Sequence, residues 1–191
     1  MRRPHVGREL LAALCGVINR CRDLGVTLIA VNPLPTISGE KFMNTFHAEA
    51  SYVIDARPEA IYNVLSDYRV GHQAILPRPV FQEMTVEQGG KGAGTVIRLR
   101  MQMYGQTFHY HHMISEPQPG RVLMETDLET GQYTTFTLEP LGNGQTRVTI
   151  ASEFPIKPGL SGFIERLMQP SVVRRLYLQE LRKLADYVRP N

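Results

Sequence analysis

Residues 94–104 read GTVIRLRMQMY, and the fold assignment of the whole chain rests on this stretch. Apolar and polar side chains alternate along it, so that one face of an extended strand would carry Ile97, Leu99, Met101 and Met103. Two arginines and a glutamine would occupy the other face. An alternation with a period of two predicts a β-strand with one buried and one solvent-exposed face.

Four more extended segments follow this strand, and they cover residues 107–115, 121–126, 133–139 and 145–154. Short connections rich in glycine or proline join them, and Gly142-Asn143-Gly144 is a strong hairpin signal. Five consecutive strands with short connections predict an antiparallel meander. Residues 158–188 carry apolar side chains at helical spacing, which predicts a long helix that covers the buried face and is kinked or split at Pro170.

The segments before the meander complete the predicted fold. Residues 44–55 form an extended segment, a first short helix begins at Pro58, and a second short helix or turn runs from Asp67 to about Ile75. Residues 81–87 predict another strand, and the glycine-rich run at 89–94 joins two strands, which is typical of a hairpin rather than a phosphate-binding loop. The predicted class is α+β, a curved antiparallel sheet of about seven strands wrapped around a long C-terminal helix.

Composition excludes several classes of protein. The chain has 191 residues and a formal charge of +3, and no cluster of Lys or Arg indicates binding to nucleic acid. No apolar run approaches the length of a membrane span. Cys15 and Cys21 would lie on different faces of one helix, which predicts neither a disulfide nor a metal site and favours a cytoplasmic location. The oligomeric state is not determined by these features.

Residues 1–42 differ from the rest of the chain and are interpreted as an N-terminal extension, with residues 43–191 forming the domain. Residues 8–22 predict a short amphipathic helix, and residues 38–41 predict a linker. Polar residues interrupt the apolar patch, so a secretory signal peptide is disfavoured. Two interpretations stay open: either translation starts naturally at Met43, or residues 1–42 are a functional tail.

Six short motifs together resemble the START-like superfamily, also called SRPBCC, which has the helix-grip fold. They read IDARPEA (54–60), VLSDY (64–68), GAGT (92–95), SEPQPGRV (115–122), FTLEP (136–140) and GQTRVT (144–149). The similarity spans residues 44–188. The superfamily includes polyketide cyclases, lipid-transfer domains and the birch-pollen allergen proteins. The resemblance implies that a hydrophobic small molecule is held between the long helix and the sheet, and it does not imply one reaction.

The alternation of the meander predicts which side chains line such a cavity. Extending the inner face of residues 97–103 to the other strands and to the long helix gives a mostly apolar lining with a few hydroxyl groups and one imidazole. The predicted lining residues are Leu99, Met101, Met103, Phe108, Tyr110, His112, Met124, Thr134, Phe136, Ile150, Phe163 and Leu167. Thr126 is placed on the same face as Met124.

Tyr110 and His112 are the candidate catalytic pair because they lie two residues apart on a strand and point the same way. A histidine could move a proton at a carbon next to a carbonyl, and a tyrosine could hold the enolate oxygen. The alternative is that both side chains only complete the lining. His109 and His111 would share the opposite face, but no third ligand is evident, so no metal and no cofactor are predicted. His47 and His72 receive no role.

Three functions are compatible with this pattern. The first is a carrier or binding protein for a lipid, a quinone or a polyketide-like molecule. The second is an enzyme of the polyketide cyclase or dehydratase type, which uses the same cavity with His112 and Tyr110 as its acid–base pair. The third is an interaction protein whose N-terminal helix docks on a partner. The absence of a Gly-x-Ser-x-Gly motif disfavours a serine hydrolase.

Overall fold

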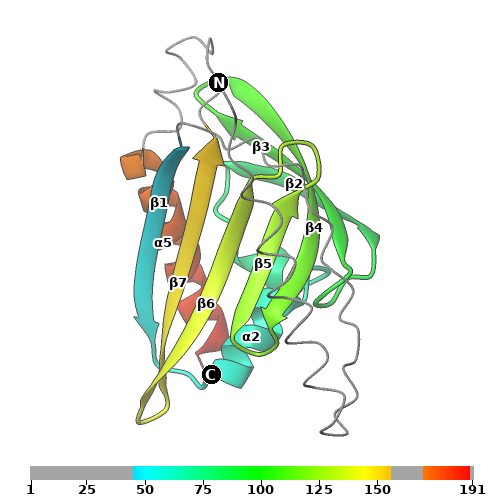
Figure 1. Ribbon diagram of the computed structural model, residues 1–191. Coiled ribbons are helices and arrows are strands. Elements are labelled where there is room, and N and C mark those ends of the chain that lie inside the picture. Colours follow the sequence, from blue (N-terminus) through cyan, green and yellow to red (C-terminus); the bar gives the residue numbers. More distant parts are fainter. Residues whose placement is uncertain (1–44, 156–169, 190–191) are drawn as a thin grey trace, which may run out of the picture. The chain divides into compact units, whose positions relative to one another are not determined.

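The computed structural model describes residues 45–155 and 170–189 (Figure 1). The predicted N-terminal extension lies outside these residues, and so do Phe163, Leu167 and the first part of the predicted C-terminal helix. The described chain forms one antiparallel sheet and three helices, which confirms the α+β helix-grip prediction.

The sheet has seven strands in the order β1-β7-β6-β5-β4-β3-β2. Their bounds are β1 Thr45–Ile54, β2 Phe81–Gln88, β3 Val96–Met103, β4 Gln106–Gln118, β5 Val122–Asp127, β6 Tyr133–Gly142 and β7 Gln145–Pro155. Strands β2 to β7 follow one another in sequence and in space, as the short glycine-rich connections predict. Strand β1 instead pairs with β7, which places the first and last strands side by side.

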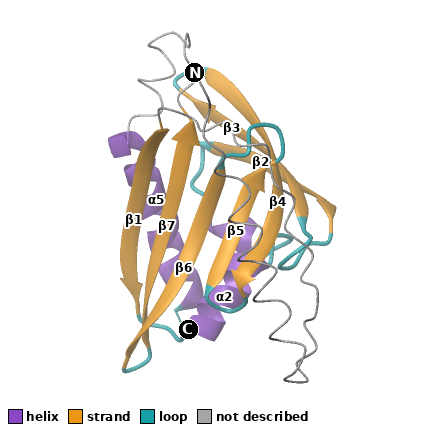
Figure 2. Cartoon of the chain, viewed as in Figure 1, coloured by secondary structure: helices purple, strands orange, loops and turns teal. Residues whose placement is uncertain are grey.

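The helices lie on one face of the sheet (Figure 2). They are α2 Pro58–Ser66, α3 Gly71–Ile75 and α5 Pro170–Val188. Helix α2 begins at Pro58 as predicted, because the fixed φ of proline suits the first turn and its missing N–H is not needed there. Helix α5 buries a stripe of side chains at spacings of one, three and four residues: Val173, Leu176, Tyr177, Glu180, Leu181 and Leu184. A carboxylate therefore lies in the otherwise apolar face of this helix.

Register between the strands brings the inner-face side chains together. Residues paired across antiparallel strands point to the same face. His112 of β4 pairs with Ile97 of β3 on one side and with Asp127 of β5 on the other. Ile114 pairs with Glu125. The inner face of β5 is therefore acidic, and it lies beside the histidine of β4.

The predicted orientation of β5 was wrong. Leu123, Glu125 and Asp127 are its buried residues, whereas Met124 and Thr126 are half-buried on the other face. Val122, Leu123 and Met124 are all apolar, so hydrophobicity does not select a face over this short strand. A register shift between Ser115 and Gln118 in the pairing of β4 with β5 also breaks the phase carried over from β4.

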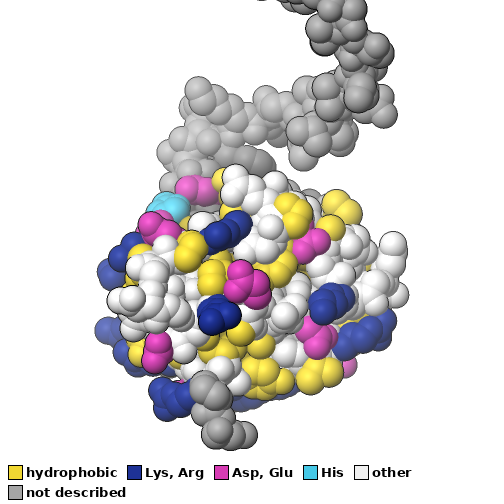
Figure 3. Space-filling model, turned by 90° about the horizontal axis from the view of Figure 1, so that it is seen from below, with side chains coloured by type: hydrophobic (Ala, Val, Ile, Leu, Met, Phe, Trp, Pro, Cys, Tyr) yellow, Lys and Arg dark blue, Asp and Glu magenta, His cyan; other side chains and the backbone are white. Residues whose placement is uncertain are grey.

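Charged side chains of both signs are interspersed on the face of the domain shown in Figure 3. Among the described residues, no helix combines the length and the apolar character that crossing a membrane requires.

Candidate functional site

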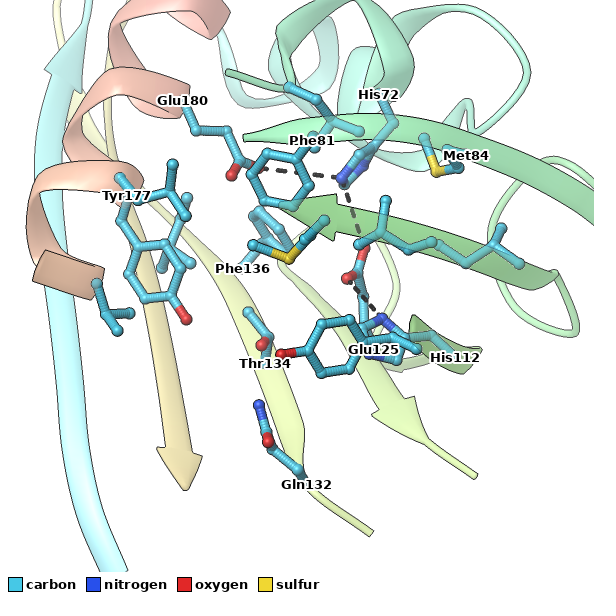
Figure 4. Close-up of a pocket in the computed structure, with 18 of the residues that line it drawn as sticks. His72, Phe81, Met84, His112, Glu125, Gln132, Thr134, Phe136, Tyr177 and Glu180 are labelled. Atoms are coloured by element: carbon cyan, nitrogen blue, oxygen red, sulfur yellow. Dashed lines mark ion pairs between the residues drawn. The ribbon is translucent and has the colours of Figure 1, made fainter. Parts of the chain in front are cut away.

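A cavity lies between the inner face of the sheet and helix α5 (Figure 4). About 100 Å³ of it is open to the centres of water molecules, several times what one water needs. Most of its wall is apolar and comes from all layers of the domain: Leu76, Phe81, Met84, Ile97, Leu99, Met101, Met103, Phe136, Ile150, Phe154, Val173 and Leu176. Polar side chains also reach it: His72, Tyr110, His112, Glu125, Gln132, Thr134, Tyr177 and Glu180. Below, this space is called the sheet–helix cavity.

Glu125 is the centre of a buried polar cluster at the wall of the cavity. Figure 4 shows its carboxylate between the imidazole rings of His72 and His112. Its Oε1 lies 3.5 Å from Nε2 of His72, and its Oε2 lies 3.4 Å from Nδ1 of His112. Tyr68 donates its hydroxyl hydrogen to Oε1 at 2.7 Å. Strand β4 contributes His112, the α2–α3 connection contributes Tyr68, and α3 contributes His72, so three elements place a polar group beside the Glu125 carboxylate.

These contacts decide the charge of Glu125. Burial is the largest influence on its pKa and opposes ionisation. The contact with His112, the charge of His72 and the Tyr68 hydroxyl together outweigh burial and lower the pKa of Glu125 below its ordinary value. The carboxylate therefore stays ionised inside the domain, because it has compensating partners on three sides.

His72 is fixed by its backbone contact. Its Nδ1 lies 2.7 Å from the carbonyl oxygen of Leu65, and a carbonyl can only accept, so Nδ1 carries a hydrogen. Nε2 is then the nitrogen that faces the carboxyl groups of Glu125 and Glu180, at 3.5 and 4.0 Å. The ring also stacks on Tyr68, with centroids 4.5 Å apart. The imidazole is therefore held rigidly, with Nε2 directed at two acids.

Gly71 permits this placement of His72. A Cβ at Gly71 would lie 2.6 Å from the carbonyl oxygen of Val64 and 3.0 Å from its Cα, so the helices α2 and α3 approach too closely there for any side chain. Tyr68 is anchored by its own N–H, which donates to the carbonyl of Gly90 at 3.0 Å. The connection between the helices and the glycine-rich turn thus positions two members of the cluster.

His112 lies between two acidic side chains of β5. Its Nδ1 is 3.4 Å from Glu125 but makes no well-aligned hydrogen bond with any described residue, and its Nε2 is 3.9 Å from Oδ2 of Asp127. Asp127 is itself engaged, because it accepts hydrogen bonds from Thr130 and from the N–H of His111. Burial opposes ionisation of Asp127, but these bonds prevail and lower its pKa.

Tyr110 lies next to His112, with ring centroids 5.5 Å apart. Burial, followed by the charge of Asp127, raises the pKa of Tyr110 to about 12. The phenol therefore remains neutral at physiological pH and can donate a hydrogen bond, but it cannot act as a base.

The pKa of Glu180 is shifted in the opposite direction to that of Glu125. Its side chain reaches from α5 toward His72, and its Oε1 has no hydrogen-bond partner among the described residues (Figure 4). Burial, then the negative charge of Glu125, raises the pKa of Glu180 to about 8, with Lys183 opposing. Two glutamates in one cavity wall therefore differ in charge at neutral pH, because only one of them has close partners.

A hydroxyl chain fixes the helix against the sheet on another side of the cavity. The Tyr177 hydroxyl of α5 forms a hydrogen bond with Ser152 of β7, and Ser152 is in turn 2.6 Å from the hydroxyl of Thr134 on β6. This arrangement gives the cavity a second polar wall, made of neutral groups only.

The arrangement supports two kinds of chemistry. An apolar guest can be held among the leucine, methionine and phenylalanine side chains, with its polar atoms near the acids, imidazoles and hydroxyls. A carboxylate beside an imidazole, with a neutral phenol next to it, also provides a base and a donor for proton transfer at carbon.

Comparison with known proteins shows the family of the chain. Residues 45–189 match the family model for polyketide cyclase/dehydrase and lipid transport. The chain belongs to this family. No curated protein matches the chain.

Several solved structures share the fold of this chain. The solution structure of KanY is 25% identical with a TM-score of 0.67, and the match covers 76% of this chain and 99% of KanY. The Zhui aromatase/cyclase from Streptomyces sp. R1128 is 20% identical with a TM-score of 0.62 and coverages of 76% and 94%. The ginseng major latex-like protein 151 from Panax ginseng is 14% identical, with a TM-score of 0.59 and coverages of 76% and 99%.

Most of the lining residues predicted from the sequence do line the cavity of this family member: Leu99, Met101, Met103, Tyr110, His112, Thr134, Phe136 and Ile150. Phe108 does not line it, although its cross-strand partner Met101 does. Met124 does not, because β5 turns it to the other face. Phe163 and Leu167 lie outside the described residues.

The sequence interpretation missed Glu125 and, apart from His112, the buried polar residues that surround it at the wall of the cavity. The sequence pattern predicts no role for His72, Glu125 or Glu180. A signal existed for Glu180, since it falls on the same helical stripe as Tyr177 and Leu184, where a charged residue is unusual. No such signal marked His72, because its partners come from a distant strand and a distant helix.

The two outer-face histidines have different surroundings and do not share a site. His111 lies 2.9 Å from a carboxylate oxygen of Glu87 on β2, and His109 is exposed. Within residues 45–155 and 170–189, no group of three or more His, Cys, Asp or Glu side chains is arranged to hold a metal ion.

Proposed function

We propose that this protein binds an apolar small molecule of the lipid, quinone or polyketide type in the sheet–helix cavity and acts as a carrier or binding protein. The observation that carries the proposal is the cavity itself, which combines a continuous apolar wall with a small set of converging polar groups. Binding pockets for small molecules have this composition. The family, whose description includes both cyclase and lipid-transport members, supports the same interpretation.

A resident ligand is the first test. The purified protein would be weighed by native mass spectrometry and again after denaturation and organic extraction. A discrete mass that disappears on denaturation is expected. Binding would be measured in parallel with Nile red, a neutral dye whose emission depends on its surroundings, since the chain contains no tryptophan whose own fluorescence could report binding.

A variant that fills the cavity gives the decisive comparison. Met103→Trp adds bulk to a residue that lines the cavity, and Met113→Trp adds the same bulk to an exposed site on the other face of the sheet. Met103→Trp should weaken Nile red binding by about tenfold or more, because the larger side chain would occupy space that the dye needs, whereas Met113→Trp should not. Equal binding by both variants, or no binding by the wild type, would contradict the proposal.

A second candidate function is acid–base catalysis of the cyclase or dehydratase kind, and the pairing of His112 with Glu125 favours it. With a hydrogen on Nδ1 facing Glu125, the Nε2 of His112 holds the lone pair that accepts a proton from the carbon next to a carbonyl. Glu125 would stabilise the resulting imidazolium, and the neutral hydroxyl of Tyr110 would donate to the enolate oxygen.

Deuterium exchange into the methyl group of 2-acetylnaphthalene, followed by NMR in D₂O, separates the two functions. An enzyme should accelerate the exchange, and His112→Gln should lower that rate by about 10² or more. A carrier should show exchange no faster than buffer, and His112→Gln should change its affinity by less than about tenfold, because one hydrogen bond contributes about 1 kcal/mol.

A further inference from the structure

Glu180 is a buried acid that faces the cavity, and its Oε1 has no hydrogen-bond partner among the described residues, the nearest imidazole nitrogen being Nε2 of His72 at 4.0 Å. The Glu180 side chain is 5% exposed and lines the sheet–helix cavity. A buried polar atom without a partner is costly, and nearly all such atoms in native proteins are satisfied. An unsatisfied oxygen at a cavity wall therefore points to a guest that satisfies it.

The nearest basic side chains are committed elsewhere. His72 donates from Nδ1 to the Leu65 carbonyl, and its Nε2 lies closer to Glu125 (3.5 Å) than to Glu180 (4.0 Å). Lys183, one turn along α5, donates to the carbonyl of Leu76 at 3.0 Å. Neither residue forms a hydrogen-bonded ion pair with Glu180, so these basic groups offset the burial of the acid only in part.

The rest of the lining restricts the chemistry of the guest. No Arg or Lys side chain is among the described residues that line the cavity, and both glutamates there are buried. A carboxylate or phosphate placed among them would meet the negative charge of Glu125, with no Arg or Lys in the described lining to offset it and with the two neighbouring imidazoles already engaged by Glu125. A neutral carbonyl oxygen, by contrast, is an acceptor that a carboxylic acid can satisfy.

We propose that Glu180 is the specificity-determining residue of the cavity: its carboxylic acid donates a hydrogen bond to a ketone or quinone oxygen of the ligand, and the cavity excludes carboxylates of the same size. This inference rests on the proposed binding function and assigns it a substrate class, neutral carbonyl compounds rather than fatty acids. The raised pKa of Glu180, caused by burial and then by Glu125, agrees with an acid that keeps its hydrogen at neutral pH.

Three naphthalene probes of nearly equal shape test this at pH 7 by equilibrium dialysis. They are 2-acetylnaphthalene, a ketone; 2-isopropenylnaphthalene, in which CH₂ replaces the ketone oxygen; and 2-naphthoate, a carboxylate. The wild type should bind the ketone about five- to tenfold more tightly than the alkene, as one hydrogen bond predicts. It should bind 2-naphthoate more weakly than either.

Two substitutions at Glu180 then test whether this residue causes the preference for the ketone over the alkene. Glu180→Met removes the donor at similar volume and should abolish the preference for the ketone without weakening alkene binding. Glu180→Gln keeps an N–H donor and should retain most of the preference, which a merely structural role of the acid would not predict. Glu129→Gln, an exposed site, is the matched control and should behave as the wild type.

Several results would overturn the inference. They are the absence of a ketone preference in a wild type that binds Nile red, a preference that survives in Glu180→Met, and binding of 2-naphthoate as tight as that of the ketone. Tighter binding of 1-(2-naphthyl)ethylamine than of the ketone would also overturn it, because Glu180 would then act as an anion. The wild-type comparison needs no variant, so the test stands even if Glu180→Met fails to fold. Failure to bind Nile red and every probe would instead overturn the proposed binding function.

Discussion

The Nε2 of His72 lies 3.5 Å from Oε1 of Glu125, with both side chains almost fully buried. The histidine belongs to α3 and the glutamate to β5, so this contact connects the helical layer to the inner face of the sheet. Tyr68 adds a second connection to the same oxygen at 2.7 Å. The polar cluster therefore stabilises the packing of the layers as well as shaping one wall of the cavity.

Glu125→Gln should destabilise the domain by about 3 kcal/mol at pH 7, because it leaves His72 and His112 beside a neutral amide in a buried site. Urea unfolding monitored by circular dichroism would measure the change. Glu139→Gln is the control, since Glu139 pairs with Arg147 at the surface and such pairs contribute less than about 1 kcal/mol. Equal stability of the two variants would show that the cluster does not hold the layers together.

Stability should also depend on pH through Glu180. Its pKa is raised to about 8 in the folded state, so between about pH 4.5 and pH 8 the folded protein binds a proton that the unfolded chain has released. The free energy of unfolding should therefore fall as pH rises through this range, with a contribution approaching about 1.4 kcal/mol per pH unit.

Glu180→Gln isolates this contribution. The titratable groups that face Glu180 come from α3, β5, α5 and the α2–α3 connection: His72, Glu125, Tyr177, Lys183 and Tyr68. They remain in the variant, so the difference between the two proteins reports on Glu180. The variant should gain stability relative to the wild type from pH 5 to pH 8.5. A difference that is constant across the range would mean that Glu180 ionises normally.

The fold was predictable because it depends on local patterns. The alternation around Ile97 and Leu99, the Gly142-Asn143-Gly144 turn and Pro58 each select a local conformation, and together they specify the meander and the first helix. The histidine and phenol on β4 were also predictable, since residues two apart on a strand share a face whatever the partner strand does.

The roles of Glu125 and His72 depend on strand register and on helix packing between distant parts of the chain, which the sequence does not display. Glu125 faces inward only because the pairing of β4 with β5 shifts after Ser115, and three consecutive apolar residues conceal this choice. His72 acquires its role from the close approach of α3 to α2 at Gly71. A carboxylate is tolerated inside because these partners converge on it, and a linear pattern of hydrophobicity cannot report such convergence.

Gly71→Ala should weaken the contact between His72 and Glu125, because α3 packs too closely against α2 at Gly71 to accept a side chain. The added methyl group would lie 2.6 Å from the backbone oxygen of Val64, so α3 must move and carry His72 away from Glu125. A loss of about 1–3 kcal/mol is expected, as for other overpacked positions. Thermal melting would measure it, and the ring signals of His72 in NMR should shift. Asn63→Ala, on the exposed face of α2, should leave both unchanged. Unaltered His72 signals in Gly71→Ala would refute the coupling between the two helices.

The hydrogen bond between Tyr177 and Ser152 should contribute to stability across the cavity, because both side chains are buried and the bond connects α5 to β7. Tyr177→Phe is expected to cost about 1 kcal/mol, and Ser152→Ala a similar amount. If the two hydroxyls act together, the double variant should cost less than the sum of the single ones, and the coupling energy from urea unfolding gives their interaction. Ser51→Ala is the control, since its hydroxyl bonds Thr149 at an exposed site. Additive effects in the double variant would mean that Tyr177 and Ser152 stabilise the domain independently and that α5 is held against the sheet by its apolar stripe alone.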